Sequence, residues 1–289
     1  MTAEGLVIHA YPELDGARLV LGFTGWMDGG GVSTGTVGYL ARKLHTQPLA
    51  EIEPAGFYIY NFPGSMEVSA LFRPHCHIDG GLVRQFQPPR NTFQFDASER
   101  LILFHGKEPN LGWERFAECI LTLAETFRVQ AIYFVGSYAG VVPHTRDPRF
   151  YATVSVPAMK PDLEVHGFRF TEYEGPAHFC TYLVRAAAER GLRMATLVAE
   201  IPAYVQGSNP RCIEAMVRTL ARVLGLRLET DDLRQAADAF EAKVGEALAD
   251  KPDLAEMVQK MEAQYDSEVF ETQMGDLKEW LEERGIRLD

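Results

Sequence analysis

Three residues able to do acid–base or ion-pair chemistry each follow an apolar run typical of a buried strand. They are Asp28, Glu108 and Arg146, and His144 stands beside Arg146. Open α/β sheets bind ligands beyond the carboxyl ends of their strands, so these loops are expected at one edge of a sheet. There Glu108 and Arg146 are predicted to lie within ion-pairing distance. They would serve either as a polar clamp on a ligand or as a pair that fixes two loops together.

The glycine-rich loop at 24–31 also lies between a predicted strand and a predicted helix. Such loops can bind phosphate through free backbone N–H groups at the start of the helix. The loop has neither the lysine of a P-loop nor the spacing of a dinucleotide-binding fingerprint. Asp28 is placed to cap the helix, and its carboxylate would repel an anion. We therefore expect a tight turn with a capped helix.

Two histidines stand two residues apart in Arg73-Pro74-His75-Cys76-His77. On an extended strand His75 and His77 would face the same side, which is a pattern seen in metal sites, and Asp79 is near. No third and fourth ligand can be named from the sequence. The alternative is a polar loop beside Gly80 and Gly81. The sequence therefore predicts neither a bound metal nor a cofactor.

Short apolar strands alternate with amphipathic helices through most of the chain. This alternation predicts a three-layer α/β/α fold around a mostly parallel mixed sheet. The expected strands lie at 17–23, 57–60, 100–105, 131–135 and 192–201, and the expected helices at 28–44, 113–127, 178–190 and 209–224.

The last fifth of the chain differs from the rest in charge. Residues 231–289 contain 17 acidic and 7 basic side chains, whereas residues 1–230 are almost neutral. This step predicts a domain boundary, with an α/β domain at 1–230 and an acidic helical extension at 231–289. Apolar residues recur three or four apart in the extension, and Pro252 separates two helices. The apolar stripes must pack on the body of the same chain or grip a neighbouring subunit.

The overall composition is that of a folded protein and disfavours several classes of partner. Of 289 residues 46% are hydrophobic, which excludes a disordered chain, and the net charge of −12 disfavours a nucleic-acid partner or an anionic membrane surface. Four widely spaced cysteines contain no CxxC pair and favour a reducing compartment. The sequence shows neither a secretory signal nor a run of apolar residues long enough to span a bilayer. We expect a cytoplasmic protein.

Four segments, taken in order and spacing, resemble the PAC2 family, named for proteasome assembly chaperone 2. The resemblance covers about residues 5–230 and is closest to the prokaryotic branch with a helical C-terminal extension. The segments are Gly25-Trp26-Met27-Asp28-Gly29-Gly30, Gly106-Lys107-Glu108-Pro109 with Trp113 and Phe116, Val142-Pro143-His144-Thr145-Arg146, and Ile201-Pro202-Ala203-Tyr204-Val205 with Asn209-Pro210.

This resemblance implies a domain similar to nucleoside phosphorylases that usually associates with itself. Archaeal and eukaryotic relatives chaperone proteasome assembly and dock through a C-terminal hydrophobic-Tyr-any tripeptide. Here the sequence ends in Arg287-Leu288-Asp289, with Leu where the tripeptide has Tyr. Docking onto a proteasome through that motif is therefore not expected.

Two functions follow as hypotheses. The first is a non-enzymatic interaction or assembly-chaperone-like protein that forms a homo-oligomer, with a trimer as the expected state. The alternative is a small-molecule-binding protein or enzyme that uses the crevice at the carboxyl ends of the strands. In either case the expected cluster consists of Trp26, Asp28, Glu108, His144, Arg146 and Tyr204.

Overall fold

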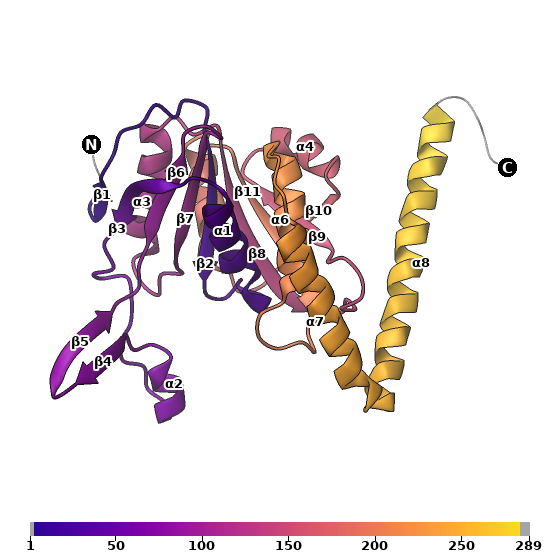
Figure 1. Cartoon of the computed structure of the whole chain (residues 1–289). Helices are drawn as coiled ribbons and strands as arrows, with labels where there is room; N and C mark the ends of the chain where they lie inside the picture. Colours follow the sequence, from indigo (N-terminus) through magenta and orange to yellow (C-terminus); the bar gives the residue numbers. More distant parts are fainter. Residues whose placement is uncertain (1–2, 284–289) are drawn as a thin grey trace.

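The computed structural model describes residues 3–283, and a nine-stranded mixed sheet organises this part of the chain (Figure 1). Its strand order is β1-β3-β6-β7-β2-β8-β11-β9-β10. The four central strands β7, β2, β8 and β11 run parallel, and antiparallel pairs flank them on both sides. The strands are β1 (Leu6–Ile8), β2 (Arg18–Thr24), β3 (Gln47–Ile52), β6 (Thr92–Asp96), β7 (Leu101–Lys107), β8 (Ala131–Gly140), β9 (Phe150–Val154), β10 (Phe168–Phe170) and β11 (Met194–Pro202).

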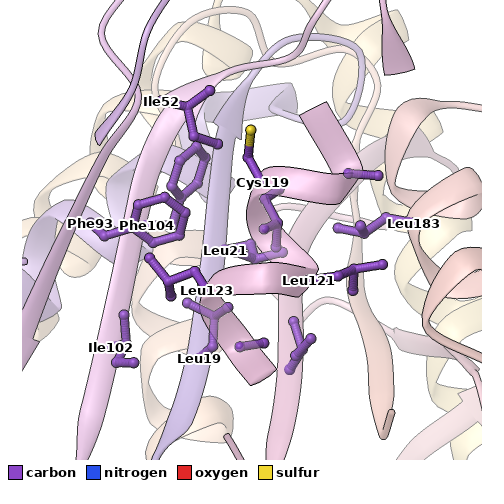
Figure 2. Packing of buried hydrophobic residues seen from close by; sticks show 14 of the residues in the cluster. Leu19, Leu21, Ile52, Phe93, Ile102, Phe104, Cys119, Leu121, Leu123 and Leu183 are labelled. Carbon is purple, nitrogen blue, oxygen red and sulfur yellow. The ribbon is translucent and has the colours of Figure 1, made fainter. Parts of the chain in front are cut away.

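Helices cover both faces of this sheet, so the predicted α/β/α fold class is confirmed. Side chains alternate between the faces of a strand, and β2 shows the consequence. Leu19 and Leu21 pack toward α3 (Trp113–Thr126) and α5 (Phe179–Glu189), as Figure 2 shows for α3, whereas Val20 lies in the second core cluster. That second cluster also holds buried residues of the helices on the other face, α1 (Val32–Lys43) and α6 (Pro210–Leu224), and of the short α4 (Lys160–Glu164).

The predicted strand at 57–60 is wrong. Phe57 closes a turn by donating its N–H to the carbonyl of Pro54, and its ring packs edge-on against Phe116 of α3 at 5.0 Å. Phe57 and Tyr58 of this short apolar run are buried in a loop, whereas Tyr60 is exposed. Five strands of the large sheet were not predicted from the sequence, namely β1, β3, β6, β9 and β10.

A separate small unit is inserted between β3 and β6. It consists of α2 (Met66–Ala70) and the antiparallel hairpin of β4 (His75–Asp79) and β5 (Leu82–Gln87). Figure 1 shows this unit projecting from the body near the carboxyl ends of the central strands. Every residue of the two hairpin strands is exposed in the protomer.

The two helices expected in the extension are present in its described part. α7 (Asp231–Ala249) packs on α6, and α8 (Pro252–Glu283) begins after a break at Asp250 and Lys251. In Figure 1 the two helices meet at their junction and then diverge, so that α8 stands apart from α7. Within the described residues, no helix is long and apolar enough to cross a membrane.

Candidate functional site

Glu108 holds two loops together at the carboxyl end of β7. One carboxylate oxygen accepts the backbone N–H of Trp26 at 2.8 Å, and the other accepts that of Phe179, the first residue of α5, at 2.9 Å. Its charge also suits the N-terminus of a helix. Glu108 does not form the predicted ion pair with Arg146, because each residue is engaged by other partners. Trp26 remains 75% exposed.

Glu108→Ala should lower the free energy of unfolding by about 2–4 kcal/mol, because two charge-assisted hydrogen bonds are lost together. Glu108→Gln should fall between this variant and the wild type, since its amide oxygen can still accept one of the two N–H groups. Urea unfolding measures both effects. Glu172→Ala, at an exposed position, is the control and should change little; an equal loss in that variant would contradict the assignment.

Asp28 caps α1, as expected from the sequence. Its carboxylate accepts the backbone N–H of Thr34 at 3.0 Å and the Thr34 hydroxyl at 2.8 Å. Burial raises the pKa of Asp28 above its ordinary value, although these hydrogen bonds act in the opposite direction. The turn before the helix needs Gly30 and Gly31, which adopt positive φ angles of 62° and 65°. The glycine loop therefore forms a tight turn before α1. The carboxylate of Asp28 stands where a bound phosphate would accept the N–H of Thr34.

His144 and Tyr204 form a second group. The Tyr204 hydroxyl accepts the backbone N–H of His144 at 2.8 Å and lies 2.8 Å from its Nδ1. Because the hydroxyl already accepts from the backbone, its own hydrogen is available for Nδ1. His144 is 4% exposed, and burial lowers its pKa, while Glu241 and Glu262 act to raise it. This arrangement selects the neutral imidazole.

The wild type should lose more stability than His144→Asn when the pH falls from about 7 to about 5. A histidine with a lowered folded-state pKa is protonated first in the unfolded chain, so acidification below about 6.5 favours unfolding. Chemical denaturation at several pH values gives the difference between the two proteins. Equal pH slopes would show that His144 titrates normally in the folded state.

Arg146 anchors the C-terminal extension. Its guanidinium makes two hydrogen bonds of 2.8 Å to the carboxylate of Asp266 on α8 and lies 3.9 Å from Glu262. The neighbouring hydroxyl of Thr145 also donates to Glu262. This paired geometry raises the pKa of Arg146 and lowers that of Asp266. Arg146 was predicted to pair with Glu108, either to clamp a ligand or to fix two loops together, and it instead docks α8.

A second anchor of α8 was not foreseen from the sequence. Arg149 is 3.2 Å from Glu200 of β11 and 2.6 Å from Glu268 of α8, and its guanidinium lies 4.8 Å from the centre of the Tyr265 ring. The side chains of Arg149 and Glu200 are only 12% and 10% exposed. The sequence signal was the recurrence of acidic residues at 262, 266 and 268, but their arginine partners are more than 110 residues away along the chain.

The predicted cluster therefore divides into two groups that contact protein rather than one open site. Trp26, Asp28 and Glu108 organise the loops before α1 and α5. His144, Arg146 and Tyr204 organise the loop after β8 and its contact with α8.

His75 and His77 lie on the exposed strand β4, and Asp79 at its end lies 3.8 Å from Arg84. Among the residues that the structure describes, no three His, Cys, Asp or Glu side chains gather as a metal site would require. The more prominent feature of this unit is apolar. Exposed large apolar residues of this unit are Met66 and Val68 on α2, Leu71 directly after it, and Ile78, Leu82, Val83 and Phe86 on the hairpin.

The sequence and the fold both have known counterparts. A family model described as the PAC2 family matches residues 22–248. None of the curated proteins matches significantly. Among solved structures, a proteasome-assembly chaperone homologue from Mycobacterium tuberculosis is 27% identical, with a TM-score of 0.72 over 83% of this chain and 99% of that one.

Two further structures extend the comparison. A PAC2 family protein from Streptomyces avermitilis is 26% identical, with a TM-score of 0.72 over 84% of this chain and 99% of its own. A Mycobacterium tuberculosis protein of unknown function is 22% identical, with a TM-score of 0.80 over 95% of this chain and 93% of its own.

Proposed function

The chain belongs to the PAC2 family, and from this premise we propose that it is a self-associating, assembly-chaperone-like interaction protein. The observation that carries the proposal is the apolar surface of α2 and the β4–β5 hairpin. Met66 is 84% exposed, Leu71 76% and Val83 65%. Large apolar patches on a protein surface mark interaction sites, because leaving them in water favours aggregation.

The partner for this surface is a second copy of the chain. The hairpin projects beyond the sheet, so it can reach a neighbour without any movement of the body (Figure 1). A contact between the hairpin of one copy and a different surface of the next is heterologous, and such contacts form a ring when the rotation between successive copies closes. We propose a ring of three, with the α/β domain at 1–230 forming its body and the helical extension at 231–289 docked on that body as a second domain.

Two further observations support an interaction role over a small-molecule reaction. The polar groups of Asp28, Glu108, His144 and Arg146 are engaged by backbone and side-chain partners. The structural neighbour from Mycobacterium tuberculosis is described as a proteasome-assembly chaperone homologue. We infer a reducing compartment such as the cytoplasm, because all four cysteines are unpaired.

Cys76 offers a direct probe of the hairpin. It is exposed on β4, whereas Cys119, Cys180 and Cys212 are buried. If the hairpin lies between copies, the rate at which a thiol reagent modifies Cys76 should fall as protein concentration rises and the assembly forms. Cys76→Ser should abolish the fast phase. An unchanged rate in an assembled sample would place the hairpin outside the interface.

A further inference from the structure

An apolar groove runs between the two helices of the extension and is separate from the hairpin surface. Its volume is about 430 Å³, and its lining includes Phe240, Val244 and Leu248 of α7 and Leu254, Met257 and Met261 of α8. Leu254 and Met257 are 43% and 58% exposed. No other described part of the protomer fills this groove, so a substantial apolar surface faces solvent there.

Acidic and basic residues of the extension lie on different sides of this groove. Glu241, Asp266 and Glu268 turn toward the body, where each lies within ion-pairing distance of an arginine. Lys243 and Lys251 instead line the groove. Within the described residues neither lysine has a carboxylate within 4.0 Å. The groove therefore combines an apolar floor with two cationic groups, in an extension whose net charge is otherwise strongly negative.

The dimensions of the groove suit an α-helix. At 1.5 Å per residue, the stretch from Phe240 to Leu248 is about 12 Å long and that from Leu254 to Met261 about 10 Å, so about two turns of a bound helix would be covered. Amphipathic helices commonly bind in such grooves through apolar residues spaced three and four apart. The flexible thioethers of Met257 and Met261 can adapt to the shape of the incoming side chains.

We propose that the groove between α7 and α8 binds one amphipathic α-helix of a partner protein, with an apolar stripe flanked by Asp or Glu. The two lysines select for acidic flanks. The same lysines disfavour binding of the hairpin from a second copy, because Arg84 on β5 would bring a like charge into the groove. The hairpin is also extended rather than helical. This inference rests on the proposed interaction function but assigns a second surface to it.

The test uses the full-length protein and two fluorescein-labelled peptides of about 12 residues, long enough for three helical turns. Both carry the same leucine stripe, and they differ only in having Glu or Lys on either side of it. Fluorescence anisotropy should show that the acidic peptide binds about fivefold or more tightly than the basic one. Lys243→Glu with Lys251→Glu should reverse that preference, and Met257→Asp should weaken both peptides.

Met257 is exposed, so its substitution should leave the fold intact; Lys260→Glu, on α8 outside the groove, is the matched charge control. Equal binding of the two peptides, no binding of the acidic peptide, or an unchanged preference in the double lysine variant would overturn the proposal. A fall in oligomer mass caused by Met257→Asp would assign the groove to self-association instead. The hairpin surface is tested independently, because substitutions there should change the oligomer and leave peptide binding unaltered.

Discussion

Arg149→Met should lower the free energy of unfolding by about 3–5 kcal/mol, because it leaves a carboxylate buried without its cation. Glu200 is 8% exposed, and the guanidinium of Arg149 lies 3.2 Å from its carboxylate. The other carboxylate oxygen of Glu200 accepts the backbone N–H of Val141 at 3.0 Å, so this carboxylate cannot turn toward solvent without losing that hydrogen bond. Urea or guanidinium unfolding, followed by fluorescence, measures the change.

Glu268→Gln is the matched control for this effect. It removes the outer partner of the same arginine, and the Glu268 side chain is 39% exposed, so the expected cost is at most about 1 kcal/mol. An equal loss in the two variants would contradict the assignment of Arg149 and Glu200 as the buried pair. A small effect of Arg149→Met would show that Glu200 reaches water when α8 moves.

Ile78→Asp combined with Phe86→Asp should dissociate the assembly into protomers. These side chains are 59% and 60% exposed in the protomer, so the substitutions remove no contact within the chain core. Burial of each side chain against a neighbour would contribute about 1.5–3 kcal/mol, and the new carboxylates would have to be desolvated. The midpoint of protomer unfolding should shift little.

His75→Asn on the same hairpin keeps a polar side chain and is the control. It should leave the assembly intact. The hairpin would be excluded as the interface if the double aspartate variant retained the wild-type mass, or if both variants dissociated equally.

Most helices and the central strands of the α/β domain could be predicted from short-range sequence features such as helix caps and apolar periodicity. α6 begins at Pro210, where the side chain of Asn209 accepts the N–H of Cys212 at 3.0 Å, and ends at Gly225, which adopts a positive φ of 65°. Both residues predicted these ends, because an Asn cap and a C-terminal glycine act locally. The apolar run at Phe57 misled because burial, rather than strand pairing, accounts for it.

The candidate site was harder to predict, because the tertiary structure determines which groups each side chain contacts. Glu108 and Arg146 were correctly placed in loops that follow strands, yet their partners are the N–H of Phe179 and the carboxylate of Asp266. No spacing in the sequence specifies either contact. Similarly, His75 and His77 suggested chemistry in a segment whose distinguishing property is exposure, and exposure appears only once the fold shows what covers each residue.

The central claim, self-association, is tested most directly by sedimentation velocity of the full-length chain at micromolar concentration. The proposed ring predicts one dominant species of about three times the 32.3 kDa protomer mass, which shifts toward a single protomer in the Ile78→Asp, Phe86→Asp variant. A monodisperse wild-type species of one protomer mass would contradict the proposal.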